Sequence, residues 1–154
     1  MEIKSAPVVN TGMLIRRPVA DVFEAFVDPE ITSKFWFTKG SGRLEAGKPV
    51  RWEWEMFGIA VDVRVRTVDA DRRIVIDWTD QDPPPTVEWI FTPRGDGEVF
   101  VEITNSGFNG NDEALVKQAL DSMGGFTLVL AGAKALLEHN IRLNLIADRY
   151  PDGH

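Results

Sequence analysis

Residues 50–66 read VRWEWEMFGIAVDVRVR, and this stretch decides the fold class. Apolar and charged side chains alternate on both sides of Gly58. A period of two is typical of a strand with one buried and one solvated face. We therefore predict two antiparallel strands joined by a turn that begins at Gly58. The predicted inward side chains of this pair are Trp52, Trp54, Met56, Val61, Val63 and Val65.

Opposite charges on the outer face predict the register of the two strands. Pairing Glu55 with Arg64 and Glu53 with Arg66 places unlike charges directly across from each other. Each such pair contributes only about 0.2–1 kcal/mol, so charge would select the register rather than supply the stability.

Three more strands follow with the same alternation. The loop at residues 79–85 contains three consecutive prolines and cannot belong to a central strand. Short turns at residues 69–71 and 93–97 join the remaining strands, which gives a meander of five antiparallel strands. The predicted inward side chains of these strands are Ile74, Ile76, Trp78, Val87, Trp89, Phe91, Val99, Val101 and Ile103.

Upstream of the meander we predict one strand and two short helices. Residues 8–17 read as the strand, and Pro18 suits the first turn of a helix. Residues 28–30, Asp-Pro-Glu, supply a capping acid, a proline at the first helical position and a further acid for a second helix. Residues 43–45 are predicted to form a short strand among glycines.

The last third of the chain is predicted to be helical. Asn109 or Asn111 can cap it, and the pair Gly124-Gly125 is expected to break or bend it. A continuous helix over residues 123–146 would span about 36 Å, enough to cross the sheet.

Residues 1–154 are therefore predicted to form one α+β domain. An antiparallel sheet with one apolar face must cover that face, and the C-terminal helix carries the large apolar stripe that remains. That helix is rich in glycine and alanine, whereas the sheet contributes four inward tryptophans. Two outcomes stay open at this point: a tightly packed aromatic core, or a void lined with rings.

Composition excludes several classes of function. The net charge of −7 has the wrong sign for binding nucleic acid. There is no cysteine, hence no disulfide or thiolate metal site. The first residues lack the pattern of a signal peptide, and the apolar stretch at residues 123–133 is too short for a membrane span. We therefore expect a cytoplasmic protein with no membrane insertion.

Catalytic chemistry is poorly represented. The two histidines are His139, late in the final helix, and His154 at the end of the chain. They do not form a nucleophilic triad or a metal-ligand cluster, and Glu53 and Glu55 read as solvated strand residues. We predict no catalytic residues, no metal and no cofactor, and the balance favours a protein that is not an enzyme.

Several motifs resemble a known family. Residues 15–26 read IRRPVADVFEAF, and residues 101–108 read VEITNSGF. Between them lie Asp28-Pro29-Glu30, Lys34 and Phe35-Trp36-Phe37. Together with Gly125-Phe126, Leu130 and Leu137, they resemble bacterial relatives of the activator of the heat-shock-protein-ninety ATPase. That family lies in the START-like (SRPBCC) superfamily, which includes the birch pollen allergen and polyketide cyclases. Phe126 departs from the pattern, because relatives usually have tryptophan after the glycine.

The resemblance implies a helix-grip fold, in which a curved antiparallel sheet wraps a long C-terminal helix and two short helices follow strand one. It also implies a cavity between sheet and helix for a hydrophobic small molecule. Trp36, near the expected mouth, would either gate entry or cap the core. The implied lining consists of Trp36, Trp52, Trp54, Met56, Val63, Trp78, Trp89, Phe91, Phe108, Met123, Phe126, Thr127 and Leu130.

Three functions remain in competition. The leading hypothesis is binding of a hydrophobic or aromatic small molecule. The second is an enzyme of the polyketide cyclase type, which needs an acid or hydroxyl in the pocket. The third is a protein-interaction module with a chaperone or a second copy of the chain as partner. The chaperone and stress-response role of the family transfers weakly, because the eukaryotic activators carry an additional N-terminal domain.

Overall fold

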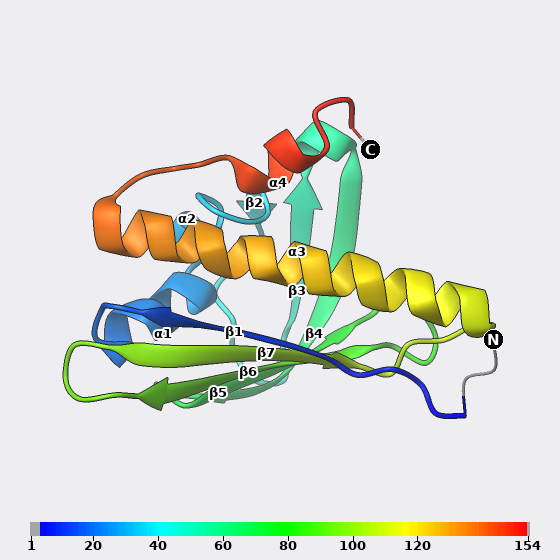
Figure 1. The fold of residues 1–154 in the computed structure, drawn as a ribbon, viewed down its shortest axis with the longest axis horizontal. Helices are drawn as coiled ribbons and strands as arrows, with labels where there is room; N and C mark the ends of the chain where they lie inside the picture. The colour runs from blue at the N-terminus through cyan, green and yellow to red at the C-terminus, as the bar shows by residue number, and fades with distance from the viewer. Residues whose placement is uncertain (1–3, 154) are drawn as a thin grey trace.

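The structure is a computed structural model that describes residues 4–153. The main helices and strands follow the order expected from the sequence, and the structure adds a 3-10 turn after β3 and a short helix at the C-terminal end (Figure 1). The elements are β1 (Val9–Ile15), α1 (Val19–Val27), α2 (Pro29–Thr32), β2 (Lys39–Gly40), β3 (Pro49–Trp54), η1 (Glu55–Phe57), β4 (Ile59–Asp69), β5 (Arg73–Trp78), β6 (Thr86–Pro93), β7 (Val99–Ser106), α3 (Asp112–His139) and α4 (Leu145–Arg149).

The sheet is antiparallel throughout and curves around α3. Its strand order is β1-β7-β6-β5-β4-β3-β2. An irregularity between Val65 and Thr67 interrupts the β4–β5 ladder, and such bulges bend a sheet. In Figure 1, strands β3 and β4 cross behind α3 and extend above it, whereas β5, β6, β7 and β1 lie below the helix. The predicted α+β helix-grip fold is confirmed.

Two short helices follow β1, as predicted. Asp28 caps α2 by accepting a hydrogen bond from the backbone N–H of Glu30 at 3.0 Å. The apolar face of α1 is buried, and Phe23 meets Phe91 of β6 edge to face, with 5.0 Å between ring centroids. Proline and acid spacing in the sequence thus fixed where α2 starts.

The predicted β3–β4 register is wrong. Glu53 lies opposite Ala60 rather than Arg66, and the paired charges are instead Arg51 and Asp62, whose side chains approach to 3.4 Å. The cause is η1 together with Gly58, whose φ of 63° is readily adopted by glycine. This tight connection pairs Trp54 with Ile59, so the strands meet closer to Gly58 in the sequence than the charge pairing predicts. Surface ion pairs are too weak to change a register that the turn has set.

The short strand predicted at residues 43–45 is also wrong. A two-residue strand forms earlier, at β2, and pairs with β3. Leu44 is buried and its N–H donates to the carbonyl of Val27 at 3.1 Å. The segment is therefore tied to the end of α1 rather than to the sheet.

Helix α3 begins at one of the two predicted caps but differs from the prediction in its middle and at its C-terminal end. Asn111 caps it, accepting from the N–H of Ala114 at 2.8 Å. Gly124 and Gly125 do not break it, because the packed face that follows outweighs a propensity cost of about 1 kcal/mol per glycine. The helix ends at His139, before residue 146, since Asn140 takes a left-handed conformation with φ of 53°. Its 28 residues span about 42 Å.

By length and composition, α3 is the one helix within residues 4–153 that could cross a membrane. A core helix of a globular protein passes the same test. Here Phe126, Val129, Leu130 and Ala133 are buried against the sheet, which is the behaviour of a core helix.

A partly buried ion pair connects the C-terminal half of α3 to the end of β1. Glu138 accepts hydrogen bonds from the backbone N–H of Arg16 at 2.9 Å and from the ammonium of Lys134 at 2.5 Å. Lys134 also donates to the carbonyl of Leu14 at 2.8 Å. Burial of the Glu138 carboxyl opposes its ionisation, but these donors outweigh burial, and the pKa of Glu138 lies below its ordinary value of 4.5.

Replacing Glu138 with glutamine is expected to destabilise the protein by about 1–3 kcal/mol at neutral pH, because charge-assisted hydrogen bonds are lost. Because the pKa of Glu138 is lowered in the folded state, its carboxylate stabilises the fold at pH values above its ordinary pKa. This contribution disappears as the pH falls through the folded-state pKa. Urea unfolding at about pH 7 and about pH 3 should therefore show a gap between wild type and Glu138→Gln that narrows in acid.

Asp121→Asn is the matched control for this experiment. It neutralises the carboxylate of another i,i+4 pair on the same helix, in which Lys117 and Asp121 have side chains that are 76% and 60% exposed. Such an exposed pair contributes little, so its loss should change stability by less than about 1 kcal/mol. An equal gap for Glu138→Gln at both pH values would show that the charge of Glu138 is not what stabilises this contact.

Candidate functional site

A cavity of about 750 Å³ lies between α3 and the concave face of the sheet. The sheet contributes side chains from β3, β4, β5, β6 and β7, and α3 contributes one face from Lys117 to Leu128. Its lining residues are Trp36, Trp54, Phe57, Ile59, Val61, Trp78, Asp80, Gln81, Pro85, Val87, Asn105, Phe108, Lys117, Gln118, Asp121, Ser122, Gly125, Phe126, Leu128, Ile146, Tyr150 and Gly153.

One wall of the cavity is a cluster of aromatic rings centred on Trp36. The Trp36 ring stacks with Trp78 at 6.3 Å between centroids and meets Phe126 edge to face at 5.7 Å. Trp54 lies 6.1 Å from Trp36 and 6.0 Å from Trp78. Trp36 is only 8% exposed and contacts rings from both the sheet and α3, so it is packed into the core as well as lining the cavity.

Behind this wall the aromatic core is solid. Trp52 stacks on Phe37 with 4.9 Å between centroids and an angle of 18°. Trp89 packs against Phe26 and Phe126 and is 1% exposed. Both outcomes left open by the sequence therefore occur together: some tryptophans fill the core, and others border an open space beside it.

The cavity lining also contains a polar strip formed by Asn105 of β7 and by Gln118 and Ser122 of α3. Ser122 donates to the side-chain oxygen of Asn105 at 2.8 Å, and Asn105 donates to the carbonyl of Thr86 at 2.9 Å. Gln118 donates from Nε2 to the carbonyls of Asn109 and Ala114. Because carbonyls only accept, this fixes the amide orientation, and Gln118 Oε1 is left buried with no partner among residues 4–153.

The mouth of the cavity carries three charged side chains. Lys117 is neutralised by Asp121 at 2.7 Å. Asp80 also lines the cavity, and partial burial raises the pKa of its carboxyl, although hydrogen bonds from its own backbone N–H and from the Trp78 side chain oppose this rise. The mouth therefore has a net negative character at neutral pH, with no unpaired cation among its described lining residues.

A sequence model of the family described as "Activator of Hsp90 ATPase homolog 1-like protein" matches residues 16–138. The chain belongs to this family. The match covers all of the sheet beyond β1 and nearly all of α3, so it includes the whole aromatic wall. The resemblance drawn from residues 15–26 and 101–108 is confirmed.

Solved structures with the same fold come from several bacteria. A protein of Staphylococcus saprophyticus is 29% identical, with a TM-score of 0.77 and coverage of 89% of this chain and 96% of the other. A protein of Mesorhizobium loti is 18% identical, with a TM-score of 0.75 and coverage of 88% and 99%. The Aha1 dimer of Colwellia psychrerythraea is 14% identical, with a TM-score of 0.71 and coverage of 86% and 97%. No curated protein matches the chain.

Only part of the lining that the family resemblance implied borders the cavity. The implied residues fall into three groups by position. Trp36, Trp54, Trp78, Phe108 and Phe126 line the cavity. Trp52, Val63, Trp89, Phe91 and Leu130 are buried in the packed core outside it.

The third group points away from the cavity. Met56 was expected inward, but η1 ends the alternation of β3 and leaves Met56 39% exposed. Met123 is 45% exposed on the outer side of α3. Thr127 is exposed and shares a hydrogen bond of 2.9 Å with the hydroxyl of Thr11 on β1. Met123 and Thr127 were misplaced because packing decides which face of α3 turns toward the sheet.

Several lining residues were missed, and some had a signal. Asn105 continues the inward alternation of Val99, Val101 and Ile103 along β7. Gln118, Ser122 and Gly125 recur at helical spacing on α3. Ile146 and Tyr150 had no signal, because a continuous helix to residue 146 was predicted where the chain in fact turns back.

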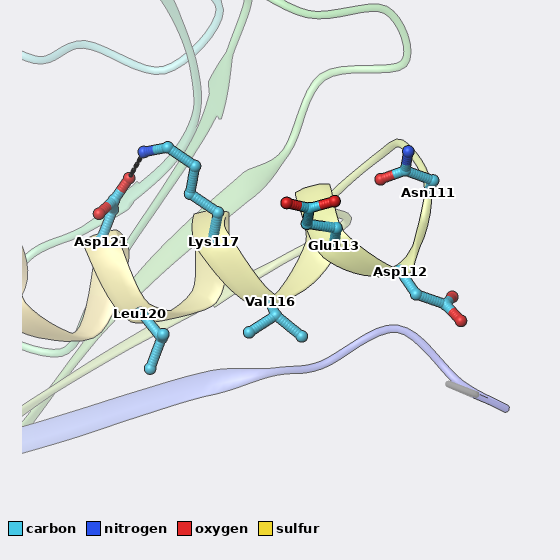
Figure 2. Close-up of a pocket in the computed structure, with 7 residues that line it drawn as sticks. All are labelled: Asn111, Asp112, Glu113, Val116, Lys117, Leu120 and Asp121. Carbon is cyan, nitrogen blue, oxygen red and sulfur yellow. Dashed lines mark hydrogen bonds and ion pairs between the residues drawn. The ribbon is translucent and has the colours of Figure 1, made fainter. Parts of the chain in front are cut away.

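A second concavity lies on the outer side of α3, near its first turns (Figure 2). Every side chain that lines it comes from residues 111–121, so it is a groove along one helix rather than an enclosed site. In Figure 2 Lys117 reaches Asp121, while Val116 and Leu120 point toward the N-terminal segment. This groove offers no convergent chemistry.

Catalytic groups are sparse within residues 4–153. No group of three or more His, Cys, Asp or Glu side chains is placed to hold a metal ion. His139 lies at the last turn of α3 beside Glu138, at 3.9 Å, and is not part of the cavity lining. The groups in the cavity that can exchange a proton are Asp80, Lys117, Asp121, Ser122 and Tyr150.

Proposed function

We propose that this protein binds a neutral, apolar or aromatic small molecule in the cavity between the sheet and α3. The observation that carries the proposal is a space of about 750 Å³ bordered by Trp36, Trp54, Trp78 and Phe126. Small-molecule sites in proteins have volumes of about 300–1,000 Å³, with mostly apolar walls and a few polar groups. The site would operate in the cytoplasm.

Charge at the mouth supports a neutral ligand over a carboxylate. An entering anion would pass Asp80 and Asp121 and would find Lys117 already paired. Inside, the donors of Ser122 and Asn105 are occupied by each other or by the backbone. A carboxylate would therefore lose its hydration without a free cation to pair with, which is costly in an apolar site.

Methylnaphthalene and naphthoate form a matched neutral and anionic pair to test this proposal. Tryptophan fluorescence reports directly, because three indoles line the cavity. We expect methylnaphthalene to change the emission saturably, and naphthoate at neutral pH to bind at least about tenfold more weakly because its charge is desolvated. No response to methylnaphthalene or to related neutral aromatics would reject the proposal.

Enzymatic activity is a second candidate, favoured by one observation. Asp80 lines the cavity with a raised pKa, and the Ser122 and Tyr150 hydroxyls lie in the same lining. A cyclase-type reaction needs such an acid or hydroxyl. Conversion of a bound aromatic substrate that Asp80→Asn slows without weakening binding would establish this role, and equal turnover would remove Asp80 from it.

An interaction role is a third candidate. The Colwellia psychrerythraea relative is described as a dimer, and this chain exposes Leu120 by 69% on the outer side of α3. Light scattering across a concentration series tests for a homodimer, and pull-down with the cognate chaperone tests for that partner.

A further inference from the structure

The chain turns back over the cavity after α3. Asn140 and Asn144 both have left-handed backbones, with φ of 53° and 54°, a conformation that asparagine tolerates better than most residues. These two turns redirect the chain into α4, which Figure 1 shows in red beside η1 and above α3. We call residues 140–153 the strap.

The strap supplies part of the cavity wall. Ile146, Tyr150 and Gly153 are among its lining residues. The ring of Tyr150 meets Phe57 of η1 edge to face, with 6.0 Å between centroids and an angle of 85°. The guanidinium of Arg149 lies 4.8 Å above the Tyr150 ring. The contact between Tyr150 and Phe57 therefore joins the strap to the sheet at the edge of the cavity.

The strap is held by few contacts. None of the residues of α4 is buried. Within residues 4–153, the backbone hydrogen bonds of residues 142–153 are local, such as that from the Asp148 N–H to the carbonyl of Asn144, and none of them joins the strap to a strand. Its remaining anchors are apolar contacts, among them Ile146 against the core and Leu145 near Gly132. A segment with so few buried contacts opens at a low free energy.

The strap also lies beyond the family-matched region, which ends at residue 138. The family segment thus provides the aromatic wall, and the strap adds a separate closing side. We propose that the strap gates the cavity and that the edge-to-face contact of Tyr150 with Phe57 is its latch. This inference rests on the proposed function for its purpose, but the opening of the strap can be measured without a ligand.

Acrylamide quenching of tryptophan fluorescence is the ligand-free test. Trp36, Trp54 and Trp78 border the cavity, so a released strap exposes them to the quencher. Loss of one edge-to-face pair shifts an equilibrium by about two- to tenfold. Tyr150→Ala is therefore expected to raise the fraction of molecules with an open strap by about two- to tenfold and to increase the quenching of tryptophan fluorescence. Leu143→Ala, at an exposed strap residue outside the lining, is the matched control and should behave as wild type.

Stopped-flow mixing with the neutral dye N-phenylnaphthylamine is the second test. Tyr150→Ala should raise the association and dissociation rates together, by about two- to tenfold, while Kd changes less than either rate, because a gate alters passage rather than affinity. Phe57→Ala should reproduce the effect. The double variant should be no faster than the single ones, since both substitutions remove the same contact.

The outcomes separate the gate from the binding function. Unchanged quenching and unchanged dye kinetics in both Tyr150→Ala and Phe57→Ala would overturn the gate. Increased quenching in these variants, with no dye bound by any form of the protein, would support the gate and reject the proposed binding function. Thermal unfolding provides the check on folding, and the midpoint should stay within a few degrees of wild type, because α4 contains no buried residue.

Discussion

Replacing Gly125 with leucine is expected to abolish most of the affinity for neutral aromatic ligands while stabilising the protein. Gly125 lines the cavity from α3, and a Cβ placed there meets no heavy atom within 4 Å. The leucine side chain therefore extends into the space that a ligand would occupy. A ligand that must share the space with this side chain loses about 1–3 kcal/mol of binding free energy, which raises Kd by roughly fivefold to a hundredfold.

The matched control lies one residue away. Gly124 is also in the middle of α3 and also has no heavy atom within 4 Å of an added Cβ, but it is exposed and outside the cavity lining. Gly124→Leu and Gly125→Leu should each raise the free energy of unfolding by about 0.5–1 kcal/mol, because leucine is a better helix former than glycine. Fluorescence titration with methylnaphthalene should show a loss only in Gly125→Leu. Equal affinities in the two variants would place ligand binding elsewhere or nowhere.

Replacing Trp36 with alanine is expected to be the most destabilising single change in the aromatic wall. Its ring contacts those of Phe37, Trp52, Trp54, Trp78, Trp89 and Phe126. Truncating a buried tryptophan costs about 3–5 kcal/mol, a large fraction of the 5–15 kcal/mol that stabilises a typical domain. Urea unfolding followed by circular dichroism measures this loss.

Two comparisons decide whether Trp36 caps the core. Ile90→Ala, on a 36% exposed side chain of β6, should cost far less than Trp36→Ala, because surface changes usually stay within about 0.5 kcal/mol. Added indole should raise the unfolding midpoint of Trp36→Ala alone, since apolar cavities left by truncation bind aromatic guests. A Trp36→Ala protein as stable as wild type would show that Trp36 is an entry gate instead.

The sequence predicted the aromatic wall of the site better than its boundary. Alternation of period two placed Trp54 and Trp78 on the concave face because the pleat of a strand fixes the side of each residue. The same rule failed at Met56, where the 3-10 turn ends the strand and turns the side chain outward. The family resemblance, rather than periodicity, supplied Phe108 and Phe126.

The polar strip and the strap show why the rest could not be predicted. Asn105 and Ser122 are 17 residues apart, and their hydrogen bond exists only because β7 and α3 are packed together. Tyr150 approaches Phe57 only because Asn140 and Asn144 reverse the chain, and no apolar period announces such a reversal. Contacts between distant segments depend on the assembled fold.

Local backbone geometry and side-chain alternation were enough to predict the order of the main helices and strands, the inward face of the five meander strands and the start of α2. Only the tertiary structure decided the β3–β4 register, the straight passage of α3 through Gly124 and Gly125, and which tryptophans fill the core. Those features are set by packing between elements, whose free energy exceeds the small local preferences of single residues.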